Sequence, residues 1–167
     1  EEVLAHLRSG QFGIHASNLG AQLAREFAML SDCPAFIVDP VVVDELDGPA
    51  RLSGHPALPR RSIFHALNQR AVARLAADEL GKAYEEARFI VCHMGGGITV
   101  GVHNRGRVVD VNNGLDGDGP FTPERSGSLP AGQMVELCFH SNLGEREIRR
   151  MIKGAGGVAA YCGTNDV

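Results

Sequence analysis

The sequence predicts an α/β protein with a mixed sheet and helices on both faces. Short apolar segments of strand length, such as residues 89–92 and 108–111, follow longer segments of helical periodicity, such as residues 62–81. After Gly97 the chain alternates between apolar and polar residues, and it reverses tightly at 104–106, which joins antiparallel strands. Because strands connected through helices are usually parallel, the two patterns together favour a mixed sheet.

Composition excludes several classes of protein. The chain has 167 residues, enough for one ordinary core or two small ones. Its net charge is -4 and it has no basic stripe with interleaved aromatic residues, so nucleic acid is not an expected partner. No apolar run approaches the roughly 20 residues that cross a bilayer, so no membrane association is expected. The four cysteines form no CxxC pair, which predicts reduced thiols in a cytoplasmic protein.

The two ends suggest a piece of a longer protein. The sequence starts at Glu1 rather than at a methionine, and it stops at Val167, directly after a glycine-rich turn. We therefore expect further residues on both sides.

The first third of the chain predicts a helix, a strand and a loop. Ser17 or Asn18 can cap a helix that continues through Leu30. A short apolar strand, residues 35–38, then ends at Asp39, and ligands of open α/β sheets bind beyond such strand ends. Residues 44–61 carry three prolines and two glycines, which indicates a loop or hinge between two lobes.

The remaining helices follow from periodicity and capping residues. Ser62 is the expected cap of a long helix ending near Gly81, and its expected buried residues are Ile63, Leu67, Val72, Leu75 and Leu80. Residues 84–87 predict one further turn. Later helices are expected at residues 131–139, 145–153 and 158–161.

Three consecutive glycines, Gly95, Gly96 and Gly97, lie between two expected strands. This placement excludes the Walker and Rossmann motifs, in which a helix follows the glycines directly. A loop of this kind can still present backbone N–H groups to an anion, because glycine adopts the necessary dihedral angles easily. A plain hairpin turn without a ligand is the alternative.

Two further segments are candidates for chemistry. Residues 112–120 form an acidic, glycine-rich turn that lacks the spacing of a calcium loop, so plain turns are expected there. Arg125 follows on a short turn of small residues, and its fork of donors suits phosphate oxygens, although a surface ion pair with Glu124 or an aspartate is the alternative. His93, at the end of the strand before the glycines, is the histidine best placed beside an anion.

Several motifs in matching order resemble the butyrate kinases of the acetate and butyrate kinase family. They are GIHASNLGAQLA, AFIVDPVVVDEL, RRSIFHALNQ, HMGGGITVGVHNRGRVVDVNNGLDGDGPFTPERSG and GTND. The resemblance covers essentially the whole chain. It implies an RNase-H-like (actin-like ATPase) fold of two lobes, with residues 1–46 ending the first lobe and 47–167 forming the front half of the second, nucleotide-binding lobe.

The resemblance also implies roles for individual residues. Asp39 falls on the acidic residue near the metal and the transferred phosphoryl group, so it is expected to be catalytic and to hold Mg²⁺. His15 and Asn18 match a segment that lines the acyl-phosphate side, and they are expected to bind substrate. His65 matches a phosphate-contacting histidine, and Arg125 an arginine that stabilises the phosphoryl group during transfer. Both are therefore expected to be catalytic.

The glycine loop is expected to bind the phosphates of the nucleotide through His93, Gly95, Gly96 and Gly97. Two departures from acetate kinase fit the butyrate kinase pattern. Gln69 replaces a second histidine, and GGG replaces GNG. These departures favour an acyl chain longer than acetate.

The implied activity is reversible, in-line phosphoryl transfer from ATP to butyrate or a related short or branched-chain fatty acid. ATP/ADP and Mg²⁺ are the implied cofactors, and a homo-oligomer is the implied assembly of the longer protein. Two alternatives stay open: a kinase for acetate or propionate, and an inactive piece that acts only as a partial phosphate-binding module. A sugar kinase or a chaperone-type ATPase is disfavoured by the ERSG and FHALNQ motifs.

Overall fold

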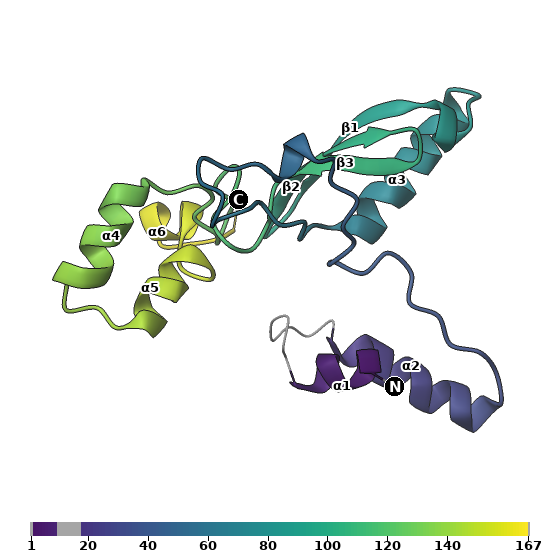
Figure 1. Ribbon diagram of the computed structural model, residues 1–167, viewed down its shortest axis with the longest axis horizontal. Coiled ribbons are helices and arrows are strands. Elements are labelled where there is room, and N and C mark those ends of the chain that lie inside the picture. Colours follow the sequence, from purple (N-terminus) through teal and green to yellow (C-terminus); the bar gives the residue numbers. More distant parts are fainter. Residues whose placement is uncertain (1, 10–17, 167) are drawn as a thin grey trace. The chain divides into compact units, whose positions relative to one another are not determined.

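The computed structural model describes residues 2–9 and 18–166. The chain divides into two compact units, Glu1–Val41 and Val42–Val167 (Figure 1). Helices accompany a three-stranded sheet, so the predicted α/β class is confirmed.

The first unit contains the helices α1 (Glu2–Ser9) and α2 (Asn18–Ser31). The predicted helix through Leu30 is confirmed, and Asn18 is its first residue, whereas Ser17 lies outside the described residues. The Asn18 side chain donates to the carbonyl of Leu7, 3.4 Å away, so that it links the two helices. The strand predicted at residues 35–38 is wrong, because this exposed segment pairs with no strand among the described residues.

The second unit is built on a meander of the strands β1 (Arg88–Met94), β2 (Ile98–Asn104) and β3 (Arg107–Val111). All pairings of the described strands are antiparallel, in the order β1-β2-β3. The expected parallel pairing is therefore not found in this part of the sheet, because its short connections join only antiparallel neighbours. Arg105 (φ 51°) and Gly106 (φ 87°) form the tight reversal that the sequence predicts, with the positive dihedrals of a primed hairpin turn.

Helix α3 (Ala66–Glu79) packs beside β1 through small side chains. Its buried residues are Ala66, Gln69, Ala73 and Ala77. The predicted burial of Leu67, Val72, Leu75 and Leu80 is wrong, since these side chains are 46% to 64% exposed. The alanines let the helix backbone approach the sheet closely, and larger side chains cannot fit in that space.

The start of α3 also differs from the prediction. Ser62 Oγ donates to the carbonyl of Val43, 2.6 Å away, instead of capping a helix, and α3 begins only at Ala66. Two 3-10 helices, η1 (Pro49–Arg51) and η2 (Tyr84–Glu86), flank this region, and η2 is the predicted further turn.

Two small apolar clusters form the core of the second unit. One contains Leu46, Phe64, Ala66, Val108 and Val111, and the other contains Ala73, Ala77, Tyr84 and Ala87. The clusters join α3 to the sheet and to the segment that precedes α3. Together they fix the position of α3 on the sheet.

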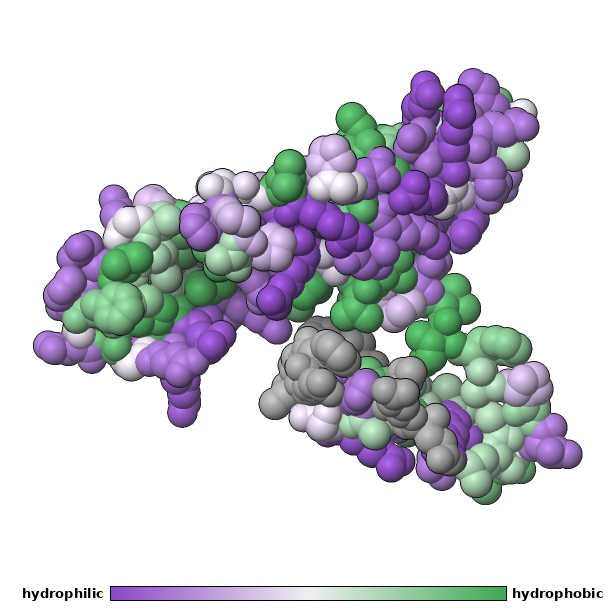
Figure 2. All heavy atoms as spheres, in the orientation of Figure 1, coloured by the Kyte–Doolittle hydropathy of each residue, from purple (hydrophilic) through white to green (hydrophobic). Residues whose placement is uncertain are grey.

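Three helices complete the second unit: α4 (Ala131–His140), α5 (Glu145–Ile152) and α6 (Gly157–Cys162). Their positions match the predicted segments. Apolar side chains gather over α4 in Figure 2, and among them Val135 is 53% and Phe139 77% exposed. No helix in the described ranges combines the length and the apolar character that a bilayer crossing requires.

Candidate functional site

The alternation of side chains along β1 and β2 directs three cross-strand pairs toward α3. The pairs are Phe89 with His103, Val91 with Gly101, and His93 with Thr99. His93 and Thr99 form the pair nearest the glycine loop, which connects Met94 to Ile98. The loop therefore lies between two strands, as predicted, and His93 stands at its edge.

Two imidazole rings are stacked next to this loop. The rings of His65 and His93 have centroids 3.7 Å apart and are inclined by only 12°. Nδ1 of His65 lies 2.9 Å from Thr99 Oγ1, and Nδ1 of His93 lies 2.8 Å from Asn68 Oδ1. Each ring is thus held by a second side chain through one nitrogen.

The electrostatic surroundings keep His65 uncharged. Burial, followed by the neighbouring His93 and Arg125, lowers the pKa of His65 to about 4. At neutral pH this histidine can therefore donate a hydrogen bond without carrying a full charge.

Arg125 lies against the glycine loop. Its Nη1 donates to the carbonyl of Gly114, 2.6 Å away, and a Cβ at position 97 would stand only 2.7 Å from its Cζ. Gly97 is thus required by close approach, since none of the three loop glycines has a left-handed φ. This reason differs from the dihedral freedom that the sequence suggested.

The guanidinium retains an unused donor. Arg125 Nε is buried and has no hydrogen-bond partner in the part of the chain that the structure describes. No ion pair of Arg125 with a carboxylate occurs there either, so the alternative of a surface pair with Glu124 is not observed. A buried donor without a partner is rare in proteins and fits an anionic ligand at this position.

A buried threonine fixes the turn that carries Arg125. Thr122 Oγ donates to the carbonyl of Gly96, 2.7 Å away, and accepts from the Arg125 backbone N–H at 3.0 Å. On the other side, Arg125 forms a β-bridge with Lys153. The turn is thereby joined to the glycine loop and to the end of α5, and the guanidinium is held in place.

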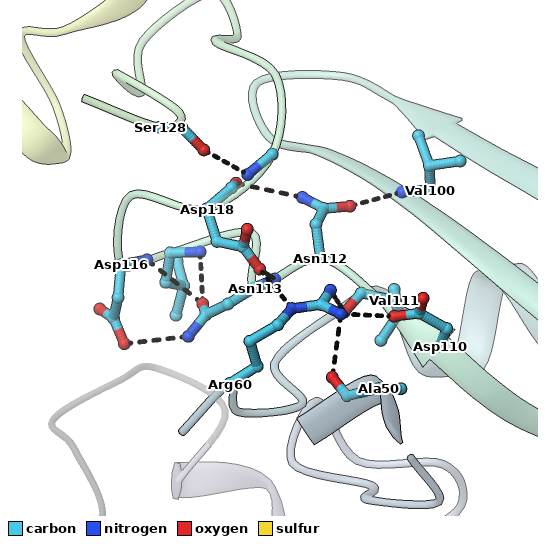
Figure 3. Close-up of polar contacts among 12 residues, drawn as sticks. Ala50, Arg60, Val100, Asp110, Val111, Asn112, Asn113, Asp116, Asp118 and Ser128 are labelled. Carbon is cyan, nitrogen blue, oxygen red and sulfur yellow. Dashed lines mark hydrogen bonds and ion pairs between the residues drawn. The ribbon is translucent and has the colours of Figure 1, made fainter. Parts of the chain in front are cut away.

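The acidic glycine turn is held by its own polar side chains (Figure 3). Asp118 accepts from the backbone of Asn113 at 3.0 Å and lies 3.7 Å from Arg60 Nε, while Arg60 also binds Asp110 at 2.9 Å. Asn113 in turn donates to the carboxylate of Asp116. These acids stabilise the turn, and the described residues contain no group of three potential metal ligands.

Asn112 attaches this turn to β2. Its amide oxygen accepts from the N–H of Val100 at 2.7 Å (Figure 3). Its nitrogen donates to the carbonyl of Ile98 at 3.2 Å. The turn consequently supplies the Gly114 carbonyl that Arg125 binds. The prediction of plain turns at residues 112–120 agrees with this arrangement.

The start of α3 adds a positive partial charge near these groups. His65 occupies the N-cap position, and no side chain caps the helix there. The first N–H groups of a helix of this length favour an anion nearby.

The structure brings together six residues that the sequence singles out. They are His65, His93, Gly95, Gly96, Gly97 and Arg125. Asn18 and Asp39 belong to the other compact unit, where the half-buried Asp39 has a positive φ of 43°. His15 lies outside the described residues.

Sequence reasoning missed the side chains that support this site. Thr99, Asn68 and Thr122 each bind a histidine or the glycine loop. The pairing of two strands around the glycines was the available signal for Thr99, because it sets that residue opposite His93.

Comparison with known proteins identifies the relatives of this chain. The model of the acetokinase family matches residues 55–167. Proteins named "Probable butyrate kinase" from Listeria innocua and Listeria welshimeri are each 53% identical over 167 residues. The chain spans about half the length of these curated relatives, 47% in each case, and all of its own residues are covered.

Solved structures show the same fold. Acetate kinase of Porphyromonas gingivalis superposes with a TM-score of 0.78 at 22% identity over 99% of this chain and 44% of its own. A propionate kinase from Francisella tularensis gives a TM-score of 0.75 at 19% identity, covering 98% and 44%. The fold is thus that of the actin-like ATPases, as the sequence predicts. With a family model matching most of its length, the chain belongs to the acetokinase family.

Proposed function

We propose that the full-length protein is a butyrate kinase, which phosphorylates butyrate or a related short or branched-chain fatty acid with ATP. The observation that carries the proposal is the guanidinium of Arg125, which lies against Gly97 and whose buried Nε has no partner among the described residues. The stacked His65 and His93 and the uncapped start of α3 add further donors beside it. The names of the two Listeria relatives support the choice of substrate.

In the proposed reaction, a carboxylate oxygen of the fatty acid attacks the γ-phosphorus of ATP. The new O–P bond forms as the bond to the β–γ bridging oxygen breaks, giving an acyl phosphate and ADP. No proton has to be removed from a carboxylate, so alignment and charge stabilisation supply the catalysis. Arg125 and His65 are assigned to the equatorial oxygens of the phosphoryl group, and His93 with Gly95, Gly96 and Gly97 to the nucleotide's phosphates.

Asp39 is proposed as the protein ligand of Mg²⁺, and His15 and Asn18 as contacts of the acyl substrate. A single carboxylate suits Mg²⁺, which is usually bound through one or two carboxylates together with substrate phosphates. When bound, the metal neutralises phosphate charge during transfer. The proposal includes residues 1–46 and 47–167 as parts of two lobes, a homo-oligomeric assembly, and a cytoplasmic reaction, which four unpaired cysteines suit.

Acceptor specificity is tested by a hydroxamate assay of the full-length protein with acetate, propionate, butyrate, isobutyrate and isovalerate. We expect the highest kcat/KM with butyrate or a branched acid. A clear preference for acetate or propionate would instead support the alternative carboxylate kinases.

A second candidate applies to the 167-residue chain by itself. The Arg125 and glycine-loop arrangement lies within one compact unit, so this chain can act as a partial phosphate-binding module without catalysis. Calorimetry with ATP and with pyrophosphate on the chain alone distinguishes this role from complete loss of binding.

A further inference from the structure

A line of buried polar side chains extends from His65 into the unit between α3 and the sheet. Hydrogen bonds lead from His65 to Thr99 (2.9 Å), to Gln69 (2.8 Å), to His103 (3.1 Å) and to Tyr84 (2.8 Å). Thr99, Gln69 and His103 are completely buried. Buried groups of this kind need matched donors and acceptors, so each proton in the line has a defined place.

A backbone carbonyl fixes the orientation of the Gln69 carboxamide and thereby the direction of the hydrogen bonds. One end of the Gln69 carboxamide lies 3.0 Å from the carbonyl oxygen of Thr99. A carbonyl only accepts, so this end is the Nε2 amide, which gives its other hydrogen to Thr99 Oγ1 at 2.8 Å. The amide oxygen of Gln69 consequently faces His103.

The orientation of Gln69 then determines which nitrogen of His103 carries a proton. Gln69 Oε1 only accepts, so His103 must carry a proton on Nε2. Burial, and then the charge of Arg70, lowers the pKa of His103 to about 4, which leaves its Nδ1 without a proton. The Tyr84 hydroxyl therefore donates to that nitrogen.

The other end of the line of hydrogen bonds is His65, in the candidate site. The Thr99 hydroxyl accepts from Gln69, and its own hydrogen needs an acceptor. Within the described part of the chain, the other side-chain atom bonded to this hydroxyl is Nδ1 of His65. His65 accepts at Nδ1, so its single proton is on Nε2.

We propose that Gln69 and Thr99 are positioning residues that hold His65 as a neutral imidazole protonated on Nε2. In this tautomer His65 offers an N–H to an anionic oxygen. The opposite tautomer would present a lone pair there and repel the same oxygen. The use of this N–H in phosphoryl transfer rests on the proposed function, whereas the tautomer itself does not.

Glutamine at position 69 is the side chain that this arrangement needs. It donates toward Thr99 with one end and accepts from His103 with the other. Gly101 makes the space, because a Cβ there would overlap the amide oxygen of Gln69. A glutamate could not donate to the Thr99 carbonyl, and it would place a charge in a fully buried position.

The tautomer can be measured in the full-length protein by long-range ¹H–¹⁵N NMR of ¹⁵N-histidine-labelled samples at neutral pH. The His65 signals are assigned by their loss in His65→Gln. We expect a protonated-nitrogen shift for Nε2 and a bare-nitrogen shift for Nδ1. A proton on Nδ1, or on both nitrogens, overturns the proposal. The tautomer is read from the unsubstituted protein, and His65→Gln serves only for the assignment.

The positioning role is tested by Thr99→Val, Thr99→Ser and Gln69→Glu. We expect Thr99→Val to give a mixture of His65 tautomers and about a tenfold lower kcat with little change in KM, as for loss of one hydrogen bond. Thr99→Ser, which keeps the hydroxyl, should retain both properties. Gln69→Glu should behave like Thr99→Val, whereas Gln133→Glu, the same change at an exposed position on α4, should have no effect.

An unchanged His65 spectrum and kcat in Thr99→Val would remove Thr99 and Gln69 from this role. The two proposals fail separately. If the full-length protein phosphorylates none of the five acids but shows the Nε2 tautomer, the kinase proposal is wrong and the tautomer assignment stands.

Discussion

At the scale of single residues, the site depends on a close contact between an arginine and a glycine. The Arg125 guanidinium occupies the space that a side chain at position 97 would need. Hydrogen bonds from Thr122 and to Gly114 hold the contact from both sides. Two substitutions test separately the charge of Arg125 and the space that Gly97 leaves for it.

Removal of the Arg125 charge should slow the chemical step. For Arg125→Ala in the full-length protein we expect kcat to fall by about 10²–10³, because one fixed donor to the transition state is lost, with a modest change in nucleotide KM. Steady-state kinetics with ATP and butyrate measure both. Arg149→Ala is the matched control, since the Arg149 side chain is exposed and binds only Glu145 among the described residues. An unchanged kcat in Arg125→Ala would remove this residue from the site.

Filling the space beside Gly97 should lower kcat in a similar way without removing any polar group. In Gly97→Ala the added methyl group overlaps the guanidinium, so we expect at least a tenfold lower kcat and a stability loss of about 1–3 kcal/mol. The matched control is Gly132→Ala, where a Cβ meets no atom within 4 Å. Kinetics and urea unfolding report the two effects, and equal behaviour of the two variants would contradict the contact.

The sequence indicated residues of the candidate site but not the side chains that hold them in place. His93, the glycines and Arg125 lie in recognisable local motifs, and the structure brings them together. The support of His65 could not be found in this way, because Thr99, which binds His65, lies 34 positions further along the chain, and Gln69 lies 30 positions before Thr99. Their relation appears only once α3 lies on the sheet.

At the scale of elements, the interface between α3 and the sheet is unusual in its polarity. Its helix side consists of alanines and one glutamine, and its sheet side includes Thr99, Gly101 and His103. Propensity and periodicity predicted the helix itself. They predicted the wrong buried face, because ranking residues by hydrophobicity ignores how closely the backbones approach and which polar groups find partners.

This interface should make stability depend on pH. His103 is buried and its pKa is lowered from 6.5 to about 4, so between these values the unfolded chain binds a proton that the folded chain does not. Stability therefore falls as pH falls through this range, by roughly 1 kcal/mol per pH unit from this residue. His65 acts in the same direction.

Unfolding in urea at several pH values between 4.5 and 7 measures this dependence. His103→Asn should flatten the curve, whereas His140→Gln, at an exposed position, should leave it as it is. If stability fell equally with pH in the unsubstituted protein and in both variants, His103 would not be the cause of the loss of stability.

At the scale of the whole molecule, the chain exposes apolar surface that complete domains usually cover. On the sheet face opposite α3, Ile90 and Met94 are each 76% exposed. In the first unit, Phe27 and Leu30 on α2 are 66% and 83% exposed. This agrees with a chain that spans about half the length of its curated relatives, 47%.

The isolated 167-residue chain should consequently have little or no kinase activity and bind nucleotide only weakly. The physical reason is that transfer requires both substrates to be held in line, and half of the expected length is absent. A coupled ADP-release assay with ATP and butyrate, run beside the full-length protein, measures the difference. Substantial turnover by the chain alone would contradict this expectation.

The meander also bears on the order in which the protein acquires its shape. Successive strands joined through Gly95–Gly97 and Arg105-Gly106 make contacts that are short along the chain, and such hairpins form within microseconds. Arg125 joins them only when its backbone pairs with Lys153 and its guanidinium binds the carbonyl of Gly114. We therefore expect His93 and the glycine loop to assemble early, and His65 and the guanidinium to be added in later and slower folding steps.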